Sequence, residues 1–158
     1  SLHTNDASGA IPRLMDMGVQ GFLVAAVLNV VSSQRLARKI HLDCIESYTP
    51  EKGMVDAVRR YLKESGLDLS GVKLPNVLYR GRGCNACNHT GYLGRIGIFE
   101  ILRITESVRK LIISPNFNLD NLRKIAREES MITMFEDGLR KIEKGLTTIE
   151  ELFRIIRE

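Results

Sequence analysis

Two cysteines separated by two residues constrain this 158-residue chain more than any other feature. Cys84 and Cys87 follow Gly83, and glycine accepts the positive φ angles of the tight turns that carry metal ligands. Well upstream, His41 and Cys44 repeat the same two-residue gap. Because zinc takes four ligands tetrahedrally from paired turns of this kind, the spacing predicts a structural zinc site formed by His41, Cys44, Cys84 and Cys87.

Two alternatives remain open at this point. His89 follows the second cysteine pair closely and is a rival to His41 as the fourth ligand. The simpler alternative is that the three cysteines are buried reduced thiols and that His41 is a surface side chain. The long interval between Cys44 and Cys84 does not exclude a metal, because each doubling of a closed loop costs only about 0.6 kcal/mol, against roughly 10–16 kcal/mol for structural zinc.

Composition places the chain in a reducing compartment. The cysteine number is odd and the chain shows no secretory signal, which argues against a disulfide scaffold and favours the cytoplasm. The apolar run over residues 22–31 is too short to span a bilayer. The net charge of +4 and the pI near 9.1 are only weak indications of an anionic partner.

Apolar periodicity predicts a mostly helical α/β chain. We expect helices from about Ser8 to Gly18, over residues 20–29 and over residues 51–65, and an extended segment over residues 71–82. Residues 30–40 and 94–103 are expected to form two paired strands. Four short amphipathic helices should follow Thr105, two of them opened by the capping boxes Thr133-x-x-Glu136 and Thr148-x-x-Glu151.

Several catalytic patterns are missing. The phosphate loop G-x-x-x-x-G-K-[ST] does not occur, so the chain cannot cradle a triphosphate by that route. No Ser/His/Asp or Cys/His set can be assembled, and His3, taken alone, is a terminal histidine of the kind that is usually solvated. A catalytic metal site needs an open coordination position, which three thiolates and a histidine do not leave.

Several distinctive motifs occur in order at residues 1–7, 13–19, 34–38, 83–100, 136–141 and 145–151. Together they resemble the carboxyl-terminal half of the GspE/PilB family, the hexameric ATPases of type II secretion and type IV pilus assembly. The resemblance covers essentially the whole chain.

The resemblance implies roles that spacing alone does not give. The Leu-His-Thr-Asn segment corresponds to the family's histidine box, so His3 would lie near the nucleotide phosphates. The cysteine pairs correspond to the family's zinc-binding tetracysteine insertion, with His41 standing where a cysteine is expected. The family's Walker A loop, Asp box and Walker B strand precede the histidine box, so this sequence looks like a carboxyl-terminal fragment of a longer motor that uses ATP and Mg²⁺.

The fold implied is α/β, mostly α: a portion of a RecA-like P-loop NTPase domain with an inserted zinc-binding subdomain and a helical extension. The expected division is residues 1–40 for the RecA-like edge, 41–93 for the zinc subdomain, 94–104 for a returning strand and 105–158 for the extension. The parent protein would act in the cytoplasm, peripherally at the inner membrane. Its partners would be its own upstream domains, neighbouring subunits of a hexameric ring, and an inner-membrane component of the secretion or pilus system.

A second hypothesis is a stand-alone zinc ribbon that binds nucleic acid. Its basic residues would contact phosphates and its tyrosines would stack on bases. The residues concerned are Lys73, Arg80, Arg82, Arg95, Tyr79 and Tyr92. On the secretion hypothesis no nucleic acid is expected, and this chain alone should not hydrolyse ATP.

Overall fold

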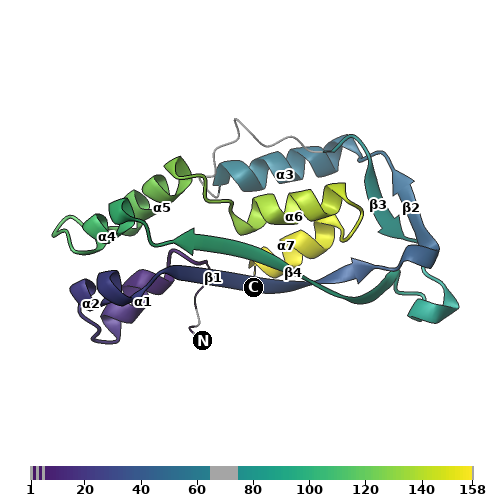
Figure 1. Cartoon of the computed structure of the whole chain (residues 1–158). Coiled ribbons are helices and arrows are strands. Elements are labelled where there is room, and N and C mark those ends of the chain that lie inside the picture. The colour runs from purple at the N-terminus through teal and green to yellow at the C-terminus, as the bar shows by residue number, and fades with distance from the viewer. Residues whose placement is uncertain (1, 3, 5, 65–74, 158) are drawn as a thin grey trace. The chain divides into compact units, whose positions relative to one another are not determined.

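The computed structural model describes residues 2, 4, 6–64 and 75–157 (Figure 1). His3 and residues 65 and 71–74, on which parts of the sequence predictions fall, lie outside the described residues. The described chain is a mixed α/β structure, as predicted. None of its helices has both the length and the hydropathy that a bilayer span requires.

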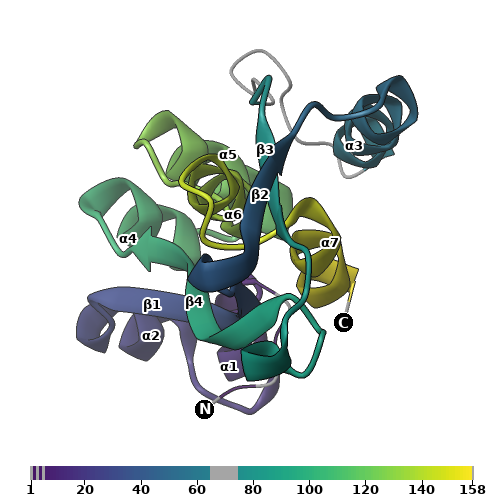
Figure 2. The same cartoon turned by 90° about the vertical axis from the view of Figure 1, so that its right-hand side faces the viewer.

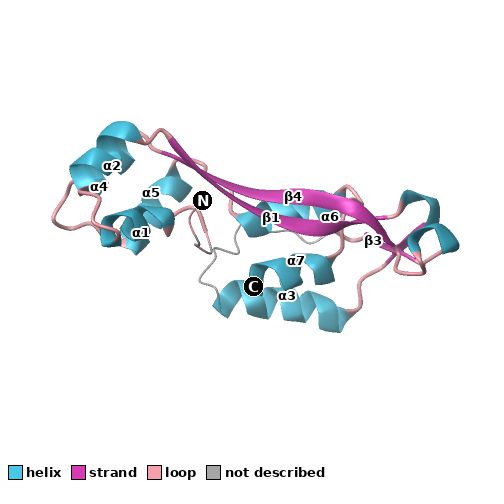
Figure 3. Cartoon of the chain, turned by 90° about the horizontal axis from the view of Figure 1, so that it is seen from below, coloured by secondary structure: helices cyan, strands magenta, loops and turns pink. Residues whose placement is uncertain are grey.

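The two longest strands of the described residues pair with each other. β1 (Val30–Ile40) and β4 (Tyr92–Arg103) pair in a two-stranded sheet, which confirms the predicted pairing (Figure 3). The His41 amide donates to the Gly91 carbonyl at one end and the Ile104 amide donates to the Asn29 carbonyl at the other, so the strands run antiparallel. The chain divides into two compact units, residues 1–35 with 98–137 and residues 36–97 with 138–157.

The first unit has an apolar core between one face of β4 and short helices. These helices are α1 (Ala10–Asp16), α2 (Gly21–Val27), α4 (Glu106–Ile112) and α5 (Leu119–Glu128). Ile11, Val24, Leu102, Val108 and Leu122 are among the fully enclosed side chains, each at 1% exposure or less. Each such side chain contributes about 1.5–3 kcal/mol by leaving water, which explains why the helical stripes seen in the sequence are core.

The same unit encloses a carboxylate. Glu100 on β4 is 6% exposed and accepts the amides of Ala7 at 2.9 Å and Met134 at 3.2 Å. Burial raises the pKa of Glu100, and the two amide donors oppose that rise. The carboxylate thereby attaches the segment before α1, and the start of α6 (Met134–Glu143), to the strand.

The second unit combines a short ribbon with helices (Figure 2). β2 (Ile45–Tyr48) pairs antiparallel with β3 (Leu78–Gly81) in the register Ile45 to Gly81 and Tyr48 to Leu78. α3 (Lys52–Glu64) packs on α7 (Ile149–Arg157) through an edge-to-face contact of Tyr61 and Phe153, whose ring centroids lie 5.2 Å apart. The sequence predicted the extended segment that contains β3, but not β2.

The predicted capping box of Thr133 and Glu136 is confirmed, whereas the box of Thr148 and Glu151 forms only one of its two hydrogen bonds. The Thr133 amide donates to the Glu136 carboxylate at 2.8 Å, and the Glu136 amide donates to the Thr133 hydroxyl at 3.3 Å. Thr148 likewise accepts the Glu151 amide at 3.4 Å. The Glu151 carboxylate instead accepts the amide and guanidinium of Arg38, at 2.8 and 2.7 Å, because that partner offers charge as well as hydrogen bonds.

Candidate metal centre

Two short turns carry the predicted ligands. β1 ends at Ile40, and a single 3-10 turn, Leu42–Cys44, follows His41. A second 3-10 turn, Asn85–Cys87, follows Cys84, and the Cys87 amide donates to the Cys84 carbonyl at 3.2 Å. The Arg82 amide donates to the Cys44 carbonyl at 2.9 Å, which holds the segment before the second turn against the first turn.

Glycines let the two segments cross closely. A Cβ atom on Gly81 would lie 2.1 Å from the Gly91 carbonyl oxygen, a distance that real Cβ atoms do not reach. Gly91 has a φ of +77°, which only glycine adopts without strain. The glycines beside the cysteines are therefore required by backbone contact as well as by turn geometry.

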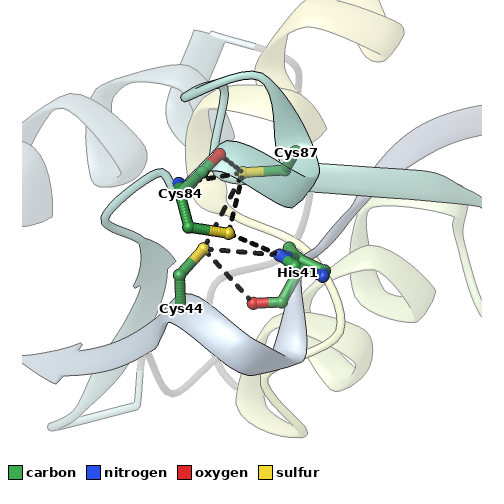
Figure 4. Close-up of side chains that lie close together, drawn as sticks. All are labelled: His41, Cys44, Cys84 and Cys87. Carbon is green, nitrogen blue, oxygen red and sulfur yellow. Dashed lines mark hydrogen bonds between the residues drawn. The ribbon is translucent and has the colours of Figure 1, made fainter.

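The four predicted side chains converge on one point (Figure 4). Nδ1 of His41 lies 3.3 Å from Sγ of Cys84 and 3.7 Å from Sγ of Cys44. Sγ of Cys87 lies 3.7 Å from Sγ of Cys84 and 4.0 Å from Sγ of Cys44. All four donor atoms lie within 4.8 Å of one another.

These separations fit a tetrahedral ion. With Zn–S near 2.3 Å and Zn–N near 2.0–2.1 Å, a regular tetrahedron places sulfurs about 3.8 Å apart and nitrogen about 3.5 Å from sulfur. The four distances in the structure fall on both sides of these values. The donor set also fits chemically, because three sulfurs and one imidazole are ligands that structural zinc sites use.

The environment of the thiols favours metal binding. Burial alone would raise the pKa of Cys87, but the amides of Cys84 at 3.2 Å and Gly91 at 3.3 Å donate to its sulfur and bring its pKa down to about 6. Burial raises the pKa of Cys44, so its thiol is the harder one to ionise without a metal. The two amide donors therefore favour the thiolate form of Cys87, which is the form that binds a metal.

The histidine is aimed at the sulfurs through Nδ1. Its other ring nitrogen, Nε2, lies 3.4 Å from an Oδ atom of Asp43. His41 itself is 6% exposed, so its ring is enclosed and not the surface side chain of the simpler hypothesis. The metal-capable group in the described residues consists of the four predicted ligands and does not include His89. The His89 amide donates to the Cys84 carbonyl at 2.9 Å, so this residue shapes the turn through its backbone.

Three residues of the nucleic-acid hypothesis, Arg80, Arg82 and Tyr92, have partners within the protein, and Lys73 lies outside the described residues. Arg80 and Arg82 face Glu46 on β2, at 2.7 and 3.6 Å. The Arg38 guanidinium lies 4.3 Å from the centroid of the Tyr92 ring, and the Tyr92 hydroxyl is hydrogen-bonded to Thr148 at 2.9 Å. Both the ring and the hydroxyl of Tyr92 are therefore engaged within the protein.

Sequence reasoning missed the charged cluster that supports this end of β1. Glu151, 1% exposed, accepts from Arg38 on β1 and from Arg154 on its own helix at 2.9–3.0 Å. Burial alone would raise the pKa of Glu151, but the two guanidinium groups hold it down at about 2. Only the unusual position of a glutamate on the apolar face of α7 could have pointed to it.

Comparison with known proteins gives consistent matches. The family model for type II/IV secretion system proteins matches residues 1–154. The chain is 38% identical over its full length to the type II secretion system ATPase E of Vibrio cholerae, covering 29% of that protein. Over 96% of its length the chain is 40% identical to the type IV pilus assembly ATPase PilB of Thermus thermophilus, and it covers 16% of that protein. The chain is also 37% identical over its full length to the type II secretion system protein E of Xanthomonas campestris, of which it covers 26%. The chain therefore spans less than a third of each of these relatives.

Proposed function

Because the chain belongs to the type II/IV secretion system protein family, we propose that it forms one part of an ATPase that drives protein secretion or pilus assembly. The observation that carries the proposal is the match over nearly the whole chain, together with relatives that are named as secretion and pilus ATPases. The nucleic-acid hypothesis receives no support from these matches.

Within such an ATPase we assign residues 1–40 to the edge of the RecA-like domain and residues 41–93 to a zinc subdomain. Residues 94–104 return as a strand and residues 105–158 form a helical extension. The β2–β3 ribbon and all four candidate ligands fall within residues 41–93, which supports that part of the assignment.

In this proposal the chain alone neither hydrolyses ATP nor binds it tightly. The supporting observation is in the sequence, which contains no phosphate loop with its lysine. We assign His3 to the histidine box, where it would sense or position phosphate in the complete motor. Mg²⁺ and ATP would be held by other parts of that motor.

We assign zinc to His41, Cys44, Cys84 and Cys87, on the support of the four-way convergence in Figure 4. When bound, zinc would supply a closed tetrahedral cross-link and no catalysis, because four protein ligands leave no position for water. These residues join the end of β1 to the start of β4 on either side of the β2–β3 ribbon. The site's contribution is therefore mechanical.

A rigid ribbon in a motor suits contact with a component that receives force. We propose an inner-membrane component of the secretion or pilus system as that partner, with the complete ATPase at the cytoplasmic side of the membrane as a hexameric ring. A purely stabilising role for the zinc is the alternative, and it differs in what a metal-site variant does to transport.

A chimera tests the proposed function. Residues 1–158 would replace the aligned segment of the V. cholerae ATPase in cells that lack their own, and secretion of a reporter would be measured. Restored secretion supports the proposal. A chimera that is stably produced and forms its oligomer, yet neither secretes nor hydrolyses ATP, would contradict it.

Variants within the chimera separate the two roles of the zinc. Cys84→Ser should abolish secretion while circular dichroism still reports folded helices. Arg82→Gln, at a side chain 66% exposed, should weaken secretion without loss of zinc. If Cys84→Ser lowers only the melting temperature and leaves secretion intact, the zinc has a purely stabilising role and the proposed partner contact is wrong.

A further inference from the structure

The three cysteines differ in accessibility. Cys44 and Cys87 are each 4% exposed, whereas Cys84 is partly exposed. All three are free thiols in the structure. Cys84 is therefore the most accessible of the three residues to a small solute, and exposure is one of the properties that decide which thiol is oxidised.

A second sulfur, that of Cys87, lies in the same turn as Cys84 and is placed to react with it. Sγ of Cys87 lies 3.7 Å from Sγ of Cys84, closer than the 4.0 Å that separates Cys87 from Cys44. Both residues belong to one turn, closed by the bond from the Cys87 amide to the Cys84 carbonyl. Closing the gap to a disulfide length of about 2.05 Å needs side-chain rotation within that turn and no rearrangement between segments.

We propose that Cys84 and Cys87 are an oxidation-sensitive pair, at which a peroxide forms a disulfide and thereby releases the metal. The proposal rests on the proposed zinc site. Cys84 would be the residue that reacts with the peroxide, and Cys87 the one that resolves the product into a disulfide.

The chemistry balances in two steps. Cys84 Sγ attacks one peroxide oxygen, so an S–O bond forms, the O–O bond breaks and one water or alcohol leaves after taking a proton. Cys87 Sγ then attacks Cys84 Sγ, so the S–S bond forms, the S–O bond breaks and the hydroxide leaves as water. The two thiols lose two electrons in total, and the peroxide gains them.

The consequence for the site follows from its composition. Oxidation of this pair leaves His41 and Cys44 as the remaining donors, and two ligands from a single turn cannot complete a tetrahedron. The hydrogen bond from the Arg82 amide to the Cys44 carbonyl and the β2–β3 pairing need no sulfur. The oxidised chain should therefore keep its ribbon and lose the cross-link between residues 41–44 and 84–87.

The test uses the zinc-loaded chain and hydrogen peroxide. Zinc release is followed with a chromogenic chelator, and peptide mapping after alkylation locates the disulfide and separates it from methionine oxidation. We expect one zinc released per Cys84–Cys87 disulfide, an alkylated Cys44, and recovery of zinc binding after treatment with dithiothreitol. A disulfide that includes Cys44, or zinc retained while Cys84 is oxidised, would overturn the proposal.

Two matched variants, measured without metal, isolate the pair. Cys44→Ala keeps both reacting sulfurs and should still form the Cys84–Cys87 disulfide. Cys84→Ala leaves two buried thiols and should consume peroxide at least about ten-fold more slowly than the wild type. Equal rates for the two variants would refute the role of Cys84. An untreated chain that binds no zinc would instead contradict the zinc assignment, so the two failures are distinguishable.

Discussion

Replacing Glu151 by glutamine should destabilise the chain strongly, although the two side chains have nearly the same shape. The carboxylate is 1% exposed and accepts hydrogen bonds from Arg38 and Arg154. Glutamine removes the charge and replaces one acceptor oxygen by a donor that would face a guanidinium. The substitution therefore removes the one fully buried charge of the cluster, that of Glu151, and leaves the two arginines without their ion-pair partner.

The magnitude follows from the shift in the pKa. A fall from the ordinary value of 4.5 to about 2 corresponds to about 3 kcal/mol of folding free energy. The side chains of Arg38 and Arg154 are 51% and 40% exposed, so they regain water when the carboxylate is lost. We therefore expect a loss of about 2 kcal/mol at neutral pH.

Urea unfolding measured at several pH values checks both the size and the sign. The folded pKa is depressed, so the stabilisation is complete above the unfolded value near 4.5 and is lost as pH falls toward 2. The difference between the wild type and Glu151→Gln should fall to about half by pH 3. Loss of metal in acid affects both proteins equally, so the difference reports on Glu151.

The neighbouring Glu150 provides the control, because it is exposed on the same helix. Glu150→Gln should change the unfolding free energy by less than about 0.5 kcal/mol. Equal effects of the two substitutions, or a Glu151→Gln effect that does not change between neutral and acid pH, would refute the reasoning.

The remaining predictions use the same chain. Gly81→Ala should destabilise it by about 2 kcal/mol or more in thermal unfolding, because the new methyl group meets the Gly91 carbonyl. Gly53→Ala, in open space on α3, should stabilise it by up to about 1 kcal/mol. If Gly81→Ala had no effect on stability, the close approach of Gly81 to Gly91 would be contradicted. Thr133→Ala should cost about 1 kcal/mol in urea unfolding through loss of its cap, and no loss would show that the box contributes nothing. By elemental analysis His41→Ala should lose zinc and His89→Ala should keep it, and the reverse pattern would reassign the fourth ligand.

Local patterns predicted a large part of this structure. Apolar periodicity placed the helices after Thr105, and β1 was predicted with its observed bounds. The convergence of the four side chains was foreseeable because two-residue gaps set the geometry of each turn locally, leaving only the meeting of the two turns to the fold.

Features that depend on distant partners were not foreseeable. β2 has four residues and gains its stability from β3, which follows 30 or more positions later, so its own sequence carries little signal. Glu151 matched a capping box locally, but Arg38, 113 positions away, takes its carboxylate. Arg80 and Arg82 resembled a phosphate-binding pair until the fold placed Glu46 beside them.

X-ray absorption at the zinc edge of the purified chain tests the central claim most directly, because it reports both the metal and its ligands. We expect one zinc per chain, bound by three sulfurs at about 2.3 Å and one nitrogen at about 2.0–2.1 Å. A shell made only of oxygen and nitrogen, or a zinc content below about half an equivalent in protein purified without chelator, would contradict the assignment of His41, Cys44, Cys84 and Cys87 as a structural zinc site.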